Sequence, residues 1–295
     1  MPLFLHPGWP LAPHDLAGAW SLDAGIVLSL AAAAALYACG LSRLWQHAGA
    51  GHGVSTWEAR AFCAGWLMLV MALVSPLHAL GEVLFSAHMA QHELLIALVA
   101  PLLILGRPLL VVLWALPAGW RRSASAWTRW RVVRNGWRAF TLPAVAWLLH
   151  AAAVWAWHVP RLYDAALTSQ ALHALQHASF LATGLLFWWA LVHGREVRMG
   201  YGPSIVYVFT TALHTGGLGA LLTFAPAPWC TAYEGTTAAW GLTRLEDQQL
   251  AGLIMWIPGS MTYLAAALVL VAAWLREAER RVGRWQHWPA LTAGE

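Results

Sequence analysis

The sequence contains no lysine, and only 10% of its 295 residues are charged. A soluble domain carries roughly 25% charged residues, so this chain lacks the polar surface that contact with water requires. Hydrophobic residues make up 60% of the chain. These proportions predict an integral membrane protein in the lipid bilayer and exclude an ordinary soluble domain.

Cysteine is also scarce. Cys39, Cys63 and Cys230 are far apart and form no C-x-x-C pair. A disulfide framework, a thioredoxin-like redox motif and a cysteine-rich metal site are therefore not expected. We expect Cys39 and Cys63 to be small buried apolar side chains, and Cys230 to be an exposed thiol in a loop.

Long apolar segments dominate what is present. A transmembrane helix needs about 20 mostly apolar residues. Segment 108–116 is too short to span and is predicted to be an interfacial helix. No internal repeat divides the chain, so we expect a single all-α domain, residues 1–295, folded as a polytopic seven-transmembrane-helix bundle. The predicted spans are 24–45, 59–80, 83–105, 140–157, 171–192, 203–224 and 249–275.

All 17 basic residues are arginine, so the formal net charge of +4 comes from guanidinium groups. With the spans above, 15 of them fall in loops on one side, and only Arg161 and Arg244 fall on the other. Basic residues accumulate in cytoplasmic loops. We therefore expect the N-terminus outside and the C-terminus in the cytoplasm. The basic charge indicates topology, and nucleic acid is not an expected partner.

Histidines, at 14, outnumber the 13 acidic residues. His88 and His92 are four residues apart, and His173 and His177 repeat this spacing, so each pair shares one helix face. Ionisable groups within a span are costly and usually face a partner inside the bundle, which favours a shared site. Four further histidines lie in the same outer half of the predicted bundle: His78, His150, His158 and His214.

The chemistry of these side chains favours a metal. Burial keeps imidazole neutral, the form that coordinates copper, zinc, iron or nickel. The thioethers of Met89 and Met255 would favour Cu(I), with ordinary apolar packing as the alternative for both. A ligating histidine normally donates its other N–H to a carboxylate, carbonyl or water, which fixes its orientation. Candidates for orienting the histidines are Glu93, Gln91, Gln176, Glu246, Asp247, Gln248 and Gln249.

Several of these segments together resemble the seven-span CtaG family of cytochrome c oxidase assembly factors. The resemblance extends over about 170 residues, in the order of the family. The matching segments are His-Met-Ala-Gln-His at 88–92 with Ala-Pro at 100–101, His150, Trp-His-Val-Pro at 157–160, Tyr-Asp-Ala-Ala-Leu at 163–167, and the segments 172–180 and 247–259.

The resemblance implies an assembly factor rather than an enzyme, a multi-pass protein of the bacterial inner membrane that handles copper on its outer side. It further implies that haem–copper oxidase subunits and other copper chaperones are partners. One position departs from the family pattern. Gln176 stands where an acid is expected, and an amide can orient an imidazole but supplies no charge.

Two other functions remain open at this point. An intramembrane zinc hydrolase would use three or more histidines and a metal-bound water, although His88 and His92 lack the H-E-x-x-H order. A haem-binding membrane redox protein would use paired histidines as axial ligands.

Overall fold

The structure, a computed structural model, describes residues 11–127, 130–194 and 199–292, and these residues are helical with no strand among them. Six helical stretches are long and apolar enough to cross a membrane, and a bent pair of helices adds a seventh if the pair counts as one span. The chain is therefore compatible with a multi-pass membrane protein.

The helices and their bounds are as follows. They are η1 (Pro13–Gly18), α1 (Ala24–Ala48), α2 (Thr56–Val74), α3 (Pro76–Gly81), α4 (Phe85–Glu93), η2 (Leu94–Val99), α5 (Ala100–Leu105), α6 (Pro108–Ala115), α7 (Ala118–Trp127), α8 (Arg131–Phe140), α9 (Pro143–Trp157), α10 (Pro160–Thr168), α11 (Gln170–Val192), α13 (Tyr201–Thr223), η3 (Thr237–Trp240), α14 (Arg244–Ile254), η4 (Met255–Gly259) and α15 (Ser260–Thr292).

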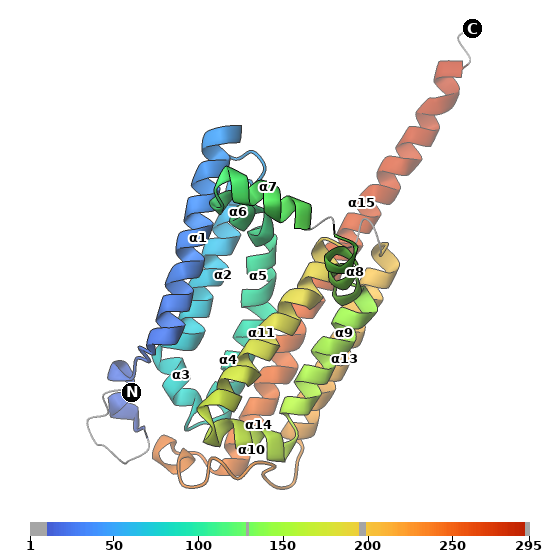
Figure 1. Cartoon of the computed structure of the whole chain (residues 1–295). Coiled ribbons are helices and arrows are strands. Elements are labelled where there is room, and N and C mark those ends of the chain that lie inside the picture. Colours follow the sequence, from blue (N-terminus) through green and yellow to red (C-terminus); the bar gives the residue numbers. More distant parts are fainter. Residues whose placement is uncertain (1–10, 128–129, 195–198, 293–295) are drawn as a thin grey trace.

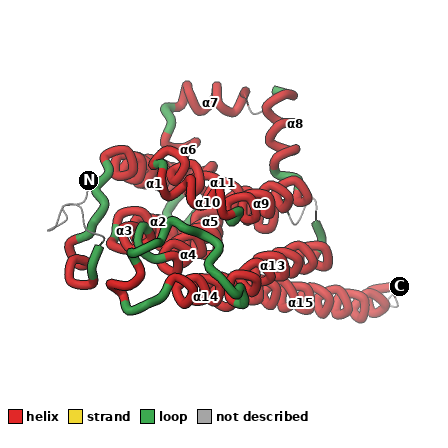
Figure 2. The backbone as a smooth tube through the Cα atoms, turned by 90° about the horizontal axis from the view of Figure 1, so that it is seen from below, coloured by secondary structure: helices red, strands yellow, loops and turns green. Residues whose placement is uncertain are grey.

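The continuous stretch α4–η2–α5 is the central span of the bundle. In its apolar 18-residue window 61% of the residues are buried, whereas the corresponding share for α1 is only 17%. Helices α2 and α11 pack against its later part and α14 packs against α4, and Figure 2 shows α4 and α5 lying among these helices. Polar side chains on α4 therefore lie inside the protein.

Arginines separate between the two ends of the bundle. Helices α7 and α8 and the final part of α15 lie at one end, while η1, α10 and the start of α14 lie at the other, which we call the α10 end (Figure 1). The described arginines of α7, α8 and α15 thus lie opposite Arg161 on α10 and Arg244 on α14. Arg129, Arg195 and Arg198 lie outside the described residues.

The predicted second span, 59–80, is wrong at its end, because α2 stops at Val74. Ser75 adopts extended backbone, with φ −72° and ψ 170°, directly before Pro76. The proline ring disfavours helical backbone in the preceding residue. A separate short helix, α3, then begins, and it carries His78 to a position that a continuous helix would not reach.

The predicted fourth span, 140–157, begins later than expected. Helix α9 starts at Pro143 and has 15 residues. At 1.5 Å per residue it measures about 22 Å, which is short of the roughly 30 Å thickness of the hydrocarbon core. Helix α8 meets it at an angle of 60°. A crossing at this place therefore needs both helices of the bent pair.

Two other predicted bounds also move. The third span begins at Phe85 rather than at residue 83. The last span begins at Arg244 rather than at residue 249, because Thr243 and Glu246 form a reciprocal capping box at the start of α14. The last helical stretch continues to Thr292, beyond the predicted end at residue 275.

The cysteine predictions are reversed in the structure. Cys39 and Cys63 are exposed and Cys230 is buried. Cys39 lies on α1, the least buried of the long helices that the structure describes. Cys230 packs beside Tyr163 and Tyr233. Burial, with a smaller contribution from nearby Asp164, raises the pKa of the Cys230 thiol to about 12, so it is held as the thiol and is poorly suited to bind metal.

Candidate metal centre

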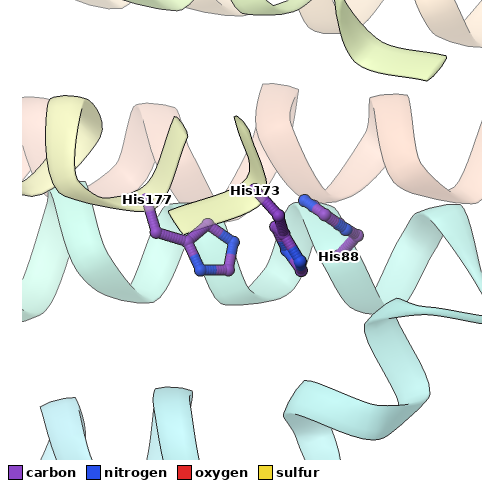
Figure 3. A group of neighbouring side chains, drawn as sticks. All are labelled: His88, His173 and His177. Carbon is purple, nitrogen blue, oxygen red and sulfur yellow. The ribbon is translucent and has the colours of Figure 1, made fainter. Parts of the chain in front are cut away.

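The two histidine pairs predicted from the sequence face each other in the structure. His88 and His92 lie on α4, and His173 and His177 lie on α11. Ring centroids are 5.1 Å apart both for His88 and His173 and for His92 and His177. Figure 3 shows the rings of His88, His173 and His177 gathered between the two helices.

Three of these rings are close enough to share one ion. One ring nitrogen from each of His88, His173 and His177 lies within 4.8 Å of the others. Nitrogens bound to a single ion at about 2.0–2.1 Å are separated by at most about 4 Å. Small rotations of the rings therefore bring the three nitrogens to coordination distance.

Two further histidines adjoin these three. The His78 ring centroid is 5.5 Å from that of His173, and the His92 ring centroid is 4.3 Å from that of His88. The histidine cluster, as we name it, consists of His78, His88, His92, His173 and His177. It lies at the α10 end of the bundle, where α4 and α11 both begin.

The cluster contains buried nitrogens without hydrogen-bond partners. They are Nε2 of His88, His173 and His177 and both ring nitrogens of His92. A buried polar atom left without a partner costs about 1–3 kcal/mol. Several such atoms converging on one point are explained by a cation that accepts their lone pairs. The residues present therefore fit a metal ion.

The orientation of His88 is set by a backbone carbonyl. Its Nδ1 donates a hydrogen bond to the Gly81 oxygen at 3.2 Å, since a carbonyl only accepts. Neutral imidazole then has its lone pair on Nε2, which faces the cluster. Tyr233 donates to the same carbonyl at 3.1 Å, and its hydroxyl is 2.7 Å from that of Tyr163. This arrangement links the loop 225–243 to the histidine cluster.

His78 is held differently. The amide nitrogen of Gln91 donates to the Ala72 carbonyl at 2.7 Å and lies 3.1 Å from Nδ1 of His78. An amide N–H donates, so Nδ1 of His78 accepts and the proton of His78 stays on Nε2. His78 thus lies at the edge of the cluster and presents a donor, in contrast to the free lone pair of His88.

The candidate orienting residues Asp247 and Gln248 have other roles in the structure. The Asp247 carboxylate accepts from the backbone N–H of Phe85 at 2.6 Å and of Ser86 at 3.1 Å. It therefore caps α4, the helix that carries His88 and His92, from 162 residues away. Gln248 accepts from the Trp229 N–H at 2.6 Å and donates to the Leu222 carbonyl at 3.3 Å, which positions the loop after α13.

Replacing Asp247 with alanine is expected to destabilise the protein by about 1–2 kcal/mol, because two buried N–H groups at the start of α4 lose their acceptor. The measurement is the midpoint of thermal unfolding in detergent, followed by tryptophan fluorescence. Glu234→Gln is the matched control, since Glu234 is exposed and 3.9 Å from its partner Arg244. Equal midpoints for Asp247→Ala and the control would contradict the capping role.

Gln176 remains close to the cluster, as the sequence predicted. It is fully buried on α11, one residue before His177. Neither its amide oxygen nor its amide nitrogen has a hydrogen-bond partner. The position therefore provides an uncharged polar group beside the imidazoles.

A cleft of about 660 Å³ between α1, α3, α10 and α11 leads to the histidine cluster. His78, His173 and His177 line it together with Asp23 and Glu82. Burial raises the pKa of the Glu82 carboxyl. The cleft thus reaches His173 and His177 directly, whereas His88 is fully buried behind them.

Four of the remaining predicted ligands form a second group, apart from His88 and His173: Met89, His150, His158 and Met255. A small cavity on the other side of His92 is lined by Met89, Glu93, His150, His158 and Met255. We call it the inner cavity. Glu93, proposed as an orienting residue, faces this cavity.

His214 belongs to neither group. Its ring lies 5.2 Å from the ring of Trp147, and its Nδ1 accepts from the indole N–H of Trp155 at 3.4 Å. Both tryptophans are on α9, so these contacts direct His214 toward that helix.

Sequence reasoning missed the residues that tie the loop to the cluster. Asp164 accepts hydrogen bonds from the backbone N–H groups of Thr231 and Ala232 at 3.1 and 3.2 Å. Tyr163, its neighbour, contacts Tyr233. Both belong to the segment 163–167, which the family resemblance had marked without giving it a role.

Residues 35–277 match the family described as cytochrome c oxidase caa3 assembly factor. The chain belongs to this family. The resemblance drawn from the histidine segments is thereby confirmed.

Relatives of this caa3 assembly factor family member occur in mycobacteria. Uncharacterized proteins of Mycobacterium bovis and Mycobacterium tuberculosis are each 27% identical over 274 residues, which cover 89% of this chain and 40% of theirs. An uncharacterized protein of Mycobacterium leprae is 25% identical over 226 residues, or 75% of this chain and 34% of its own. The chain thus spans well under half the length of these relatives. No solved structure matches it.

Proposed function

We propose that this protein binds copper as its cargo in the histidine cluster and supplies it to a haem–copper oxidase during assembly. The observation that carries the proposal is the convergence of the three unpartnered imidazole nitrogens of His88, His173 and His177. Imidazole is a good copper ligand. Membership of a family of cytochrome c oxidase assembly factors supports copper over other metals.

The proposal places the protein in a bacterial plasma membrane with the histidine cluster on the outer side. The separation of arginines supports this orientation, because the cluster lies at the α10 end, opposite α7 and α8. Oxidase subunits and other copper chaperones are the proposed partners. The role is delivery rather than catalysis, so the metal leaves the site by ligand exchange.

Zinc is the alternative that the same geometry favours. Three histidines with a vacant fourth position are also the ligand set of a catalytic zinc ion. The two functions are separated by the metal that the protein carries when it is purified from cells supplied with both metals. Copper delivery predicts copper, whereas a zinc hydrolase predicts zinc.

The protein purified in detergent is expected to bind copper, and His173→Gln/His177→Gln is expected to weaken binding at the histidine cluster at least tenfold, because two of three ligands are lost. The measurement is metal analysis after dialysis against a copper-binding competitor. The control is His47→Gln/His52→Gln, which changes two exposed histidines distant from α10.

Undiminished copper binding in His173→Gln/His177→Gln would contradict the assignment of the cluster. A sharp Soret band in the absorption spectrum of the purified protein would contradict the copper proposal in another way and favour haem.

A further inference from the structure

The inner cavity holds a close contact between an imidazole nitrogen and a thioether sulfur. His158 follows α9, and its Nδ1 donates to the Val154 carbonyl at 2.6 Å. A carbonyl only accepts, so the neutral ring has its lone pair on Nε2. That Nε2 lies 3.3 Å from Sδ of Met89. In this tautomer of the neutral ring, two atoms with lone pairs face each other.

A soft cation resolves this contact. Zinc binds nitrogen at roughly 2.0 Å and sulfur at roughly 2.3 Å. An ion with bonds of similar length bridges Nε2 of His158 and Sδ of Met89 when it lies to one side of the line that joins these two atoms. Both atoms are inside the protein, since Met89 is fully buried and His158 is 6% exposed.

Further donors surround the same space. Met255 and His150 line the inner cavity, and Nε2 of His150 has no hydrogen-bond partner. Thioether sulfur with imidazole selects Cu(I) over zinc and over hard cations. The histidine cluster, by contrast, presents imidazole alone. The two groups of ligands therefore differ in the ions they prefer.

The backbone around the inner cavity departs from regular α-helix on both sides. Residues Leu94–Val99 and Met255–Gly259 are π-helical, and such turns occur frequently at functional sites. Gly259 packs directly on the carboxylate of Glu93, where a Cβ would lie 2.6 Å from Oε2. Only glycine leaves room for this carboxyl group beside the cavity.

His92 connects the two groups. Its ring centroid is 4.3 Å from that of His88, and His92 also lines the inner cavity. Neither of its ring nitrogens has a hydrogen-bond partner. Because both ring nitrogens are available, His92 can bind an ion from one site and release it to the other. The ion then moves between the sites without entering lipid.

We propose that the inner cavity is a second metal site, in which Met89, His158 and Met255 bind Cu(I), and that His92 passes the ion to it from the histidine cluster. The proposal rests on the copper-binding function proposed above and adds to it a sulfur-containing site. Copper enters and leaves as Cu(I), so no electron transfer is involved.

The test uses the full chain in detergent under anaerobic conditions with ascorbate, loaded with Cu(I) and, separately, with Ag(I) as a redox-inert analogue. The wild-type protein is expected to bind two ions, and X-ray absorption at the copper edge is expected to show a sulfur neighbour. Met89→Leu/Met255→Leu is expected to bind one ion with nitrogen neighbours only. Leucine conserves the side-chain volume, so the fold is retained.

Two comparisons complete the test. Met71→Leu/Met261→Leu is the matched control, since both methionines are exposed, at 54% and 63%. It is expected to bind like wild type. His173→Gln/His177→Gln is expected to lose the ion of the histidine cluster and to keep the sulfur-bound ion, when loaded directly with Cu(I) at excess.

Each result supports or overturns the inference. Two ions and an unchanged sulfur neighbour in Met89→Leu/Met255→Leu would overturn it, as would a wild-type spectrum without sulfur. If the wild-type spectrum lacks sulfur but shows one nitrogen-bound ion, the proposed function still stands. If the wild type binds only a sulfur-bound ion, the proposed function fails and the inner site stands. Wild-type protein labelled with selenomethionine tests the same site without any substitution. Its X-ray absorption at the copper edge is expected to show selenium in place of sulfur beside copper.

Discussion

Cells whose only copy carries His88→Gln, His173→Gln and His177→Gln are expected to lose at least nine-tenths of their cytochrome c oxidase activity. All three nitrogens that converge at the histidine cluster are removed, so no ion binds there for delivery. The measurement is oxygen consumption by isolated membranes supplied with reduced cytochrome c. Glutamine retains polarity and approximate size, and immunodetection of the variant in membranes shows that the chain accumulates.

Excess copper in the growth medium separates delivery from a purely structural role. If the protein delivers copper, added copper is expected to restore part of the lost oxidase activity in the triple variant. If the protein only holds the oxidase subunits together, added copper has no effect. His47→Gln/His52→Gln is again the control, with activity equal to wild type. Wild-type activity in the triple variant would contradict the proposed function.

Gly252→Val is expected to prevent accumulation of the folded protein, with a cost of about 3 kcal/mol or more from overpacking. A Cβ at Gly252 would lie 2.5 Å from the carbonyl oxygen of Gly219 and 2.6 Å from the backbone nitrogen of Thr223. These are backbone atoms, which do not rotate away. Helices α13 and α14 approach each other this closely only because Gly219 and Gly252 have no side chain.

Gly217→Ala provides the comparison, because nothing lies within 4 Å of a Cβ at that position. Glycine in a helix interior costs about 0.8–1.0 kcal/mol relative to alanine. Gly217→Ala is therefore expected to raise the midpoint of thermal unfolding in detergent, and Gly252→Val to lower it or to leave no folded protein to measure. Equal midpoints in the two variants would show that the close approach of α13 and α14 contributes nothing.

Much of the fold follows from composition and hydropathy. Low charge and long apolar segments predicted a helical membrane protein, and the positions of most spans agree within a few residues. What the sequence hid is where helices break. The Ser75–Pro76 break was readable as a pre-proline position, but the apolar run continued through it, so residues 59–80 looked like one helix. Pro258 marks the π-helical turn at 255–259 in the same way, whereas the turn at 94–99 contains neither proline nor glycine.

The histidine pairs were predictable because helical periodicity places residues four apart on one face. Their division into two groups was not. His158 and Met89 meet across 69 residues, and Asp247 reaches the start of α4 across 162 residues. Such contacts depend on how the helices pack. The reversal of Cys39 and Cys230 has the same origin, since hydropathy does not distinguish a lipid-facing helix surface from a protein-facing one.

Gln176 has a consequence for the charge of the bound ion. In the proposed copper complex, His88, His173 and His177 are neutral ligands, and the amide that stands in place of an acid beside them adds no negative charge. A cation held there keeps its full positive charge in a low-dielectric surrounding, where such a charge is costly. If the histidine cluster carries copper as proposed, this cost favours release of the ion to a partner whose ligands supply negative charge.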